Sequence, residues 1–379
     1  MSYLEYNVKF VPSGIRKVLY LNWGLILLLS AIVAFGLLMQ YSVAGGSTQP
    51  WMEPQFKRFL MGLFAMFVVA MVPIWFWRNV SAVAYVGTFL LLIYVELFGS
   101  VRMGAQRWID LGFMRLQPSE LMKIALVMLL AAYYDWLPLK KVSRPLWVLI
   151  PAVLILLPTA LVLTQPDLGT ALLLMMGGGA MMFLAGVHWA YFGTVIVSGV
   201  GLVATVLKSR GTPWQLIEDY QFRRIDTFLD PSNDPLGAGY HITQAKIALG
   251  SGGLTGRGFM QGTQTRLNFL PEKHTDFIFV TLAEEFGLIG AVMLLTLYAL
   301  VVGFCIVSAL RNRDRFSSLL TLGIAVTFFL YFAVNTFMVM GLAPVVGVPL
   351  PLVSYGGSVM LVLLAAFGLV QSAHVHRAR

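Results

Sequence analysis

The sequence predicts an all-α polytopic membrane protein with about ten transmembrane helices, and two observations lead to that fold class. Hydrophobic residues make up 58% of the 379 residues and charged residues only 11%, whereas soluble domains carry about 25% charged residues. The apolar residues also fall into separate runs of the roughly 20 residues that a membrane span needs. The single cysteine, Cys305, excludes a disulfide framework and a thiolate metal cage, and we interpret it as a small buried hydrophobe.

Ten apolar runs are candidates for membrane spans. We expect them at 19–40, 57–76, 80–98, 118–137, 147–164, 168–187, 190–207, 278–308, 317–340 and 357–373. The first run continues into further spans and lacks a small-residue cleavage site, so we interpret it as a retained helix and not as a signal peptide. An even number of spans places both termini on the same side of the membrane.

The positions of Lys and Arg predict the orientation. Twelve of the 26 basic residues lie on the side of the termini, and fourteen lie on the other side. Eight of those fourteen fall in the long segment 208–276, where the positive-inside rule weakens. We therefore expect both termini in the cytoplasm and the segments 42–56, 99–117, 208–276 and 342–356 outside. The net charge of +9 is interpreted as a topology signal and not as a nucleic-acid-binding surface.

We expect one domain over residues 1–379, with a cytoplasmic tail at 1–18 and an extracytoplasmic loop at 208–276 between helices 7 and 8. The loop carries eight basic and seven acidic residues, so its charge is mixed. Apolar residues recur there at helical spacing, which predicts short amphipathic helices lying on the outer surface. No tandem repeat and no second soluble domain is visible in the sequence.

Absent motifs narrow the chemistry. The chain has no GxxxxGK phosphate loop, HExxH, CxxC or GxSxG motif. Ser119 and Lys123 are four residues apart, which excludes an SxxK motif. The chain contains no Asp-x-Asp pair, so nothing suggests a metal clamp for a nucleotide sugar. The glycine-rich GSGGLTGRG at 250–258 does not fit GxGxxG. It is either a flexible or closely packed loop, or a set of backbone N–H groups that face a pyrophosphate.

The outer loop 104–123, GAQRWIDLGFMRLQPSELMK, holds several candidate binding residues. Pro118 suits the first position of a helix and Glu120 suits its first turn. Glu120 and Lys123 then form either a structural ion pair or a site for a substrate anion. Arg107 adds a cation to this loop, and Trp108 is either an interfacial anchor or a ring on which a sugar stacks.

Two further segments on the expected outer side carry candidates. In QPDLGTA (165–171), Asp167 is either a helix-start acid or a binding carboxylate. Between 334 and 358, three prolines and several glycines interrupt an apolar region that includes Ser354. Because lipid-exposed irregular backbone is not tolerated, this segment is either a protein-covered re-entrant element or a cavity wall that contacts substrate.

The stretch 264–287, QTRLNFLPEKHTDFIFVTLAEEFG, holds the densest group of titratable residues, Arg266, Glu272, Lys273, His274, Asp276, Glu284 and Glu285. Placing such a cluster at a membrane boundary costs free energy, so we treat it as a candidate functional site. We expect a helix to begin near Thr275 or Asp276, which would put Asp276 in the first turn and Glu284 on the same face. Asp276 is either a helix cap or a catalytic carboxylate, and a cap alone leaves Glu284 and Glu285 unexplained.

Together, GAQRWIDLG…QPSELMK, QPDLGTA, QGTQTRLNFLPEKHTDFIFVTLAEEFG and GLAPVVGVPLPLVSYGGS resemble the SEDS family of bacterial cell-wall proteins (shape, elongation, division, sporulation), whose members include RodA and FtsW. The four motifs occur in the family's order, and the resemblance covers nearly the whole chain. GTQTRLNFLPE and FLDPSNDPLGAGYHITQAKIALGSGG resemble the elongation branch, RodA, more than the division branch. Leu121, where an aromatic residue is common, is a mild departure.

The resemblance implies a ten-span fold and a peptidoglycan glycosyltransferase that polymerises lipid II at the outer face of the cytoplasmic (inner) membrane for cell elongation and rod shape. Asp276 matches the aspartate that the family needs for activity, and it would act as general base on the acceptor 4-hydroxyl. Direct attack would invert the anomeric centre. Cations would face the pyrophosphate, with or without a divalent ion such as Mg²⁺ or Mn²⁺. The expected substrate-binding residues are Arg107, Trp108, Glu120, Lys123, Asp167, Lys273, His274, Glu284 and Ser354.

The resemblance also implies partners, namely a class B penicillin-binding protein (a transpeptidase) and other membrane proteins of the elongation complex. Two other functions fit the residues on physical grounds alone. One is a transporter that flips a lipid-linked precursor, and the other is a non-catalytic scaffold for the partner synthase. The candidate residues gather on the expected outer side, which favours the enzyme, because a flippase should need polar groups at both faces.

Overall fold

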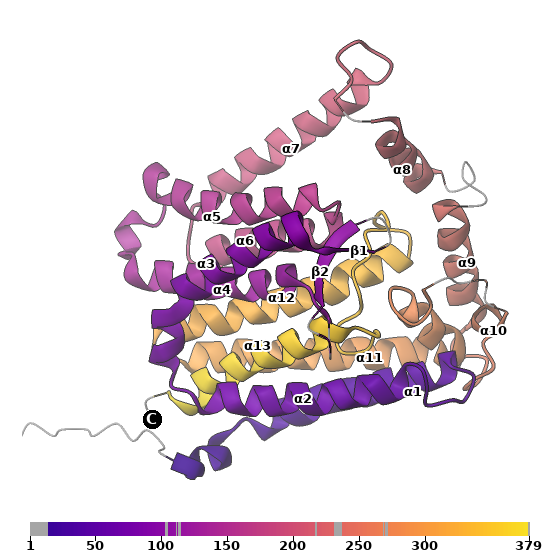
Figure 1. Cartoon of the computed structure of the whole chain (residues 1–379), viewed down its shortest axis with the longest axis horizontal. Coiled ribbons are helices and arrows are strands. Elements are labelled where there is room, and N and C mark those ends of the chain that lie inside the picture. The colour runs from indigo at the N-terminus through magenta and orange to yellow at the C-terminus, as the bar shows by residue number, and fades with distance from the viewer. Residues whose placement is uncertain are drawn as a thin grey trace, which may run out of the picture.

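The structure is a computed structural model that describes residues 14–377 except 103–104, 111, 113–114, 217, 231–236, 268 and 270–271. The predicted N-terminal tail therefore lies outside the described residues up to position 13. The chain is mostly helical, and its long helices run side by side through one bundle (Figure 1).

All ten predicted runs form helices. They are α1 (Trp23–Val43), α2 (Met52–Met71), α3 (Ile74–Phe98), α4 (Pro118–Trp136), α5 (Pro145–Thr164), α6 (Leu168–Leu184), α7 (Trp189–Ser209), α11 (Ile278–Arg311), α12 (Arg315–Val339) and α13 (Gly357–Val375). Counted over the described residues, eight are long and apolar enough to cross a membrane. The two others are α6, which has 17 residues, and α4, which carries Glu120, Lys123 and Asp135. The fold class is confirmed.

Short elements lie between the long helices. The segment 208–276 contains α8 (Asp219–Leu229), α9 (Ala238–Ser251) and α10 (Thr263–Arg266), as its apolar spacing predicted. Two 3-10 turns, η1 (Gly14–Tyr20) and η2 (Leu139–Lys141), precede α1 and α5. A small antiparallel sheet of β1 (Ser100–Arg102), β2 (Ala105–Asp110) and β3 (Arg115–Leu116), in that order, was not expected. Strands of two to six residues are too short to show a clear alternating pattern.

The core of the bundle is formed around α12 and α13, whose apolar windows are 72% and 83% buried. Helix α13 packs along α2, α11 along α12, and α3 along α4. Helix α7 differs, since none of its apolar window is buried. It extends away from the other helices toward α8 (Figure 1). A bilayer would solvate this exposed apolar helix as it does any lipid-facing span.

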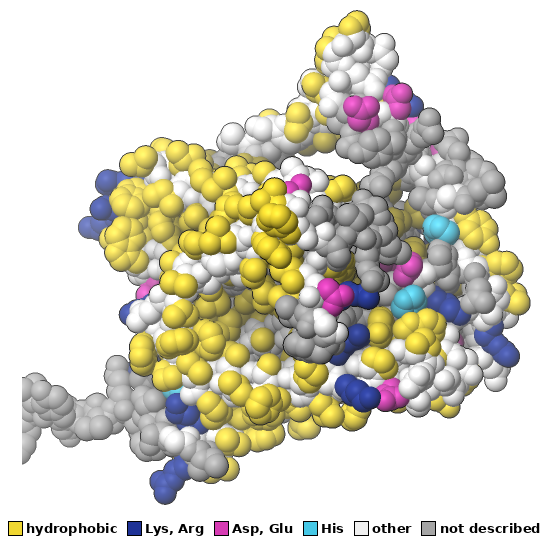
Figure 2. All heavy atoms as spheres, viewed as in Figure 1, with side chains coloured by type: hydrophobic (Ala, Val, Ile, Leu, Met, Phe, Trp, Pro, Cys, Tyr) yellow, Lys and Arg dark blue, Asp and Glu magenta, His cyan; other side chains and the backbone are white. Residues whose placement is uncertain are grey.

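The two ends of the bundle differ in what they carry. Figure 1 places the sheet, the irregular segment between α12 and α13, and α8–α10 at one end, whereas η1 and the C-terminus lie at the other. Hydrophobic side chains cover the middle of the face in Figure 2, and charged side chains gather toward both ends. This distribution is typical of a bundle whose helices cross a bilayer between its two ends.

The second half of the irregular segment 340–356, from Val348 onward, is covered by protein, and its carbonyl groups accept hydrogen bonds from buried polar side chains of four different helices. Val348, Leu350, Leu352 and Val353 are at most 2% exposed. The donors are Gln40 to Val353 O (3.0 Å), Gln55 to Ser354 O (3.0 Å), Tyr298 to Pro351 O (2.7 Å) and Asn335 to Val348 O (2.7 Å). Non-helical backbone at membrane depth persists because neighbouring helices satisfy its polar groups. The segment is therefore a fixed wall at one end of the bundle.

The glycine-rich segment 250–258 packs against a break in α11. Gly287, with φ of 65°, interrupts that helix and frees backbone groups on both sides. The N–H groups of Arg257 and Gly258 donate to Glu284 O and Glu285 O, both at 3.0 Å. A side chain at Gly256 would lie 2.1 Å from Glu285 O. These contacts support the close-packing interpretation of the glycines, because the N–H groups already have backbone partners.

Candidate functional site

Asp276 lies in a turn that runs from Glu272 to Phe277 and leads directly into α11. The helix expected to begin near Thr275 or Asp276 begins at Ile278, so the expected place of Asp276 in its first turn is wrong. Asp276 is thus not a first-turn residue, and its predicted i, i+8 alignment with Glu284 does not apply. Placement in a turn leaves its carboxylate clear of the helix backbone, so it is not a capping group for α11.

The turn is held on two sides. Asn335 on α12 donates one amide group to both Asp276 O (2.9 Å) and Val348 O (2.7 Å), which ties the turn to the irregular segment. Ser354 donates to Thr275 O and accepts from Leu350 N at 2.8 Å. Tyr355 N donates to His274 O at 2.8 Å. The structure therefore shows Ser354 acting on the backbone beside Asp276.

The Asp276 side chain is half-buried, and no hydrogen bond or ion pair engages its carboxylate within the described part of the chain. Burial, together with the negative charge of Glu272, raises its pKa from the ordinary 3.8 to about 6. A side chain at Gly347 would approach Asp276 Oδ2 at 3.6 Å, so the glycine keeps space beside the carboxylate. An unengaged carboxylate with a pKa near neutrality suits a general base.

Two basic residues share this turn. Lys273 Nζ donates to Thr265 O at 2.8 Å, and burial lowers the pKa of Lys273. The His274 ring stacks on Trp51 with centroids 4.7 Å apart, and burial lowers its pKa despite Glu272 at 3.8 Å. Both residues therefore lie in the same turn as Asp276, and each is anchored by a contact outside that turn.

A second polar cluster is buried between α4 and α12. Lys123 Nζ lies 2.7 Å from Glu120 Oε1, and both side chains are 3–4% exposed. Tyr331 on α12 donates its hydroxyl to the other Glu120 oxygen, and its ring lies 4.3 Å from Lys123 Nζ. The expected ion pair between Glu120 and Lys123 is present. Tyr331 and Asn335 are one helical turn apart on α12, so this helix joins the cluster to the Asp276 turn.

Asp167 begins α6 as its N-cap and is the centre of a third group. Its carboxylate accepts from Thr170 N at 3.1 Å and from Gln117 Nε2 at 3.0 Å. Arg107 on β2 lies 3.9 Å from Asp167 Oδ2 and donates to Gln165 O at 2.8 Å. A side chain at Gly169 would lie 2.5 Å from Val346 O, so α6 begins directly against the irregular segment.

Glu284 and Glu285 face away from any open space. The Glu284 carboxylate accepts from Gln264 N (2.8 Å), Thr265 N (3.3 Å) and Thr265 Oγ1 (3.0 Å), so it fastens α10 to α11. Glu285 accepts from Ser42 on α1, and its second oxygen is buried without a partner within the described residues. Because Lys273 is bonded to Thr265 O, Glu284 acts on the Asp276 turn through α10.

Sequence reasoning missed Arg58 and Tyr355 as members of this region. The Arg58 guanidinium lies 4.7 Å from the Tyr355 ring centroid, and its Nη1 is buried with no partner among the described residues. A side chain at Gly357, the first residue of α13, would lie 3.8 Å from that guanidinium. A cation and a helix N-terminus both favour an anion. Arg58 lies at the start of the apolar run 57–76 in the sequence, and only its contact with the distant Tyr355 reveals its place in this region.

Trp108 lies on β2, opposite Ser100 of β1, and is half-buried.

No group of three or more His, Cys, Asp or Glu side chains that could hold a metal ion occurs among the residues described.

Residues 19–379 match the family described as cell cycle proteins, which comprises FtsW, RodA and SpoVE. The chain belongs to this family. The peptidoglycan glycosyltransferase MrdB (RodA) of Escherichia coli is 44% identical over 362 residues, which cover 94% of each chain. The probable peptidoglycan glycosyltransferase FtsW of Escherichia coli is 37% identical, over 93% of this chain and 83% of that one. The higher identity to MrdB agrees with the predicted elongation branch of the FtsW/RodA/SpoVE family.

Two solved structures of the FtsW/RodA/SpoVE fold are similar to this chain. One is a chain in a peptidoglycan synthase complex that coordinates polymerization and crosslinking, with a TM-score of 0.80 and 32% identity over 95% of this chain and 99% of that one. The other is the rod shape determining protein RodA of Thermus thermophilus, with a TM-score of 0.71 and 29% identity over 95% and 98% of the two chains. The chain is thus a multi-pass membrane protein of this family over nearly its whole length.

Proposed function

We propose that this chain is a peptidoglycan glycosyltransferase that polymerises lipid II into glycan strands during cell elongation. The observation that carries the proposal is the Asp276 carboxylate. It is half-buried and unengaged within the described residues, its pKa is raised to about 6, and backbone and side-chain bonds from α12 and the irregular segment hold its turn in place. Relatives that carry this activity in their names support the proposal along the whole chain.

In the proposed reaction, the acceptor 4-hydroxyl attacks the anomeric carbon of a lipid-pyrophosphate-linked donor. Asp276 accepts the hydroxyl proton as the new C–O bond forms and the anomeric C–O bond to pyrophosphate breaks. The pyrophosphate leaves with the bonding electrons, and the anomeric centre is inverted. A general base contributes about 10²- to 10⁴-fold to such a step. A pKa of about 6 keeps Asp276 ionised at neutral pH while leaving it more basic than an exposed aspartate.

The leaving pyrophosphate needs positive charge beside it. We assign this role first to Arg58 on α2, because its Nη1 has no partner within the described chain and its guanidinium lies beside Gly357 at the start of α13. Lys273, His274, Arg107 and Trp108 are further proposed contacts to the pyrophosphate and sugars. Glu120, Lys123 and Asp167 form the buried wall beside this region, and Glu284 and Ser354 position the Asp276 turn.

We further propose that the Asp276 end of the bundle faces the extracytoplasmic side and that both termini are cytoplasmic. The Lys and Arg residues of the short loops support this orientation. Lipid II presented on the outer leaflet would then meet Asp276 at the membrane surface. A class B penicillin-binding protein is the proposed partner, because the chain resembles a member of a complex that couples polymerization to crosslinking.

Polymerisation of lipid II in detergent tests this function. The purified chain, supplied with its partner whose crosslinking site has been inactivated, is incubated with labelled lipid II, and glycan length is read on a gel. A detergent micelle has no separate inner and outer leaflet, so a flippase would give no product in this assay, whereas a polymerase would make long strands. Absence of strands under conditions where a processive control enzyme makes them would leave the transporter or the scaffold as the better function.

A further inference from the structure

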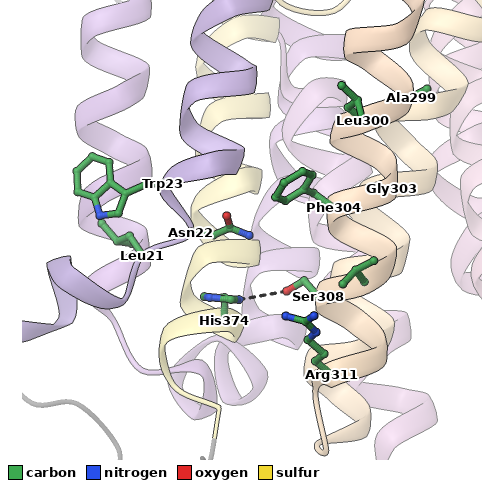
Figure 3. A pocket seen from close by; sticks show the side chains of 11 residues that line it. Leu21, Asn22, Trp23, Ala299, Leu300, Gly303, Phe304, Ser308, Arg311 and His374 are labelled. Carbon is green, nitrogen blue, oxygen red and sulfur yellow. Dashed lines mark hydrogen bonds between the residues drawn. The ribbon is translucent and has the colours of Figure 1, made fainter.

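A cavity of about 570 Å³ lies where α1, α11 and α13 meet, at the end of α11 that is remote from Asp276 (Figure 3). None of its lining residues belongs to the Asp276 turn or to the clusters described above. Its chemistry changes along its length, from an apolar wall on α11 to a polar end near the last residue of that helix. The proposed glycosyl transfer makes no use of it.

The polar end is cationic, and none of the described residues that line it is acidic. Figure 3 shows Arg311, Ser308, His374 and Asn22 gathered there from three different helical segments. The Arg311 guanidinium has no hydrogen-bond or ion-pair partner within the described chain. The Asn22 oxygen accepts from Leu25 N, which leaves its amide N–H groups available. A guanidinium, an amide and a hydroxyl without a carboxylate form a set of donors for a phosphate group.

The nearest acidic residue along the chain does not neutralise this end. Asp314 accepts from both Ser317 N (3.0 Å) and Ser317 Oγ (2.7 Å), so its carboxylate is committed to the N-cap of α12. The uncompensated charge of Arg311 therefore remains available to an anion.

The apolar wall is open on its outer side. Leu300, Phe304 and Val307 recur at helical spacing along α11, and they are 45%, 40% and 48% exposed. Trp23 on α1 is also among the lining residues, with its indole turned toward Phe67 of α2. At Gly303 a side chain would meet nothing within 4 Å, which widens the groove. A free phosphate has no use for this wall, whereas a hydrocarbon chain would cover it.

We infer that this cavity binds an anionic phospholipid, with its phosphate at Arg311, Ser308 and Asn22 and an acyl chain along Leu300, Phe304 and Val307. Charge complementarity selects the headgroup, since basic pockets between membrane helices favour anionic lipids. The apolar stripe selects a lipid over a soluble phosphate. The site lies on the side that the basic loop residues assign to the cytoplasm, where anionic lipids are enriched. It does not depend on the proposed glycosyltransferase function.

Binding of phosphatidylglycerol and of phosphatidylcholine with identical acyl chains to the purified full-length chain tests the headgroup. Native mass spectrometry after lipid titration gives the apparent Kd of each. We expect phosphatidylglycerol to bind more tightly and Arg311→Gln to weaken it about fivefold or more, since one basic residue contributes about this much at a membrane surface. Arg313→Gln is the matched control, because it removes the same charge two residues away and does not line the cavity. Equal affinity for the two lipids, or equal losses in the two variants, would overturn the inference.

The acyl chain is tested by filling the groove. The Cβ of Gly303→Leu would meet nothing within 4 Å, and leucine strengthens the helix, so the chain should fold. Gly87→Leu on α3 is its control, since that glycine also has open space and lies outside the cavity. We expect only Gly303→Leu to weaken phosphatidylglycerol binding. Undiminished binding in Gly303→Leu, or displacement of the lipid by millimolar inorganic phosphate, would show a phosphate site and contradict a lipid site.

Discussion

Acidification should inactivate the enzyme through Asp276. Burial and Glu272 raise the pKa of this carboxyl to about 6, and a general base works only when it is deprotonated. At pH 5 a group with that pKa is about one-tenth ionised, whereas one with the ordinary aspartate pKa would be more than about 90% ionised. Initial rates of lipid II polymerisation should therefore fall about tenfold between pH 7.5 and pH 5, and should recover when the pH is restored.

Glu272→Gln tests the origin of this acid limb. The substitution removes the like charge and keeps an acceptor for Thr275 Oγ1, which bonds to Glu272 at 3.1 Å. The pKa of Asp276 should fall, so the acid limb should move to lower pH. The move should be less than about one unit, because burial is the larger cause and the Glu272 side chain is 44% exposed.

His274 also titrates below its ordinary pKa of 6.5, since burial lowers it. His274→Gln separates the two groups, because the acid limb should persist if Asp276 carries it. Melting temperatures recorded at each pH exclude unfolding as the cause of lost activity. A rate that stays flat from pH 8 to pH 5, or an acid limb that disappears in His274→Gln, would refute the assignment to Asp276.

Three further substitutions test the surroundings of the site. Lys123→Met should destabilise the chain by about 3–5 kcal/mol, because it leaves the Glu120 carboxylate buried without its cation. Adding Glu120→Gln should recover part of that loss in thermal unfolding. Absence of any recovery would contradict a pairwise interaction between Glu120 and Lys123. Gly256→Ala should lower the free energy of unfolding by more than about 2 kcal/mol, because its Cβ would lie 2.1 Å from Glu285 O. Gly253→Ala, which has open space at a similar φ, should lower it by only about 1 kcal/mol. Equal melting temperatures of the two variants would contradict close packing at Gly256. Arg58→Met should raise the KM for lipid II about tenfold or more, the usual effect of losing one charged hydrogen bond, with little change in melting temperature, while Lys57→Met, whose side chain is 69% exposed, should leave KM unchanged.

Local patterns in the sequence predicted much of this molecule. Ten apolar runs gave ten helices, because span length and hydrophobicity are properties of each segment alone. Asp167 begins a helix, and Glu120 pairs with Lys123, because both relations connect residues within four positions. The turn before α11 was less predictable. Local propensity would extend α11 into this turn, but the turn is held by hydrogen bonds to Asn335 and Ser354, which lie about 60 to 80 residues away in the sequence.

Long-range partners account for what the sequence did not reveal. The glycines at 250–258 are explained by the helix break at Gly287, which no periodicity within the apolar run indicates. Glu284 was expected among the substrate-binding residues, but α10 supplies its donors from 20 residues upstream. Arg58 lies at the start of the apolar run 57–76, and only the fold places it beside Tyr355. In each example the decisive contact joins elements that are distant in sequence.

Asp276→Asn provides the most direct measurement of the central claim. The amide has nearly the same shape but cannot accept the proton, so polymerisation of lipid II should fall about 10²-fold or more. The raised pKa means that the ionised carboxyl disfavours the folded state above pH 6, so the variant should melt at the same temperature as the wild type or higher. Lost polymerisation with retained stability is the predicted result. Full polymerisation by Asp276→Asn, in the presence of the partner protein, would contradict the assignment of Asp276 as general base.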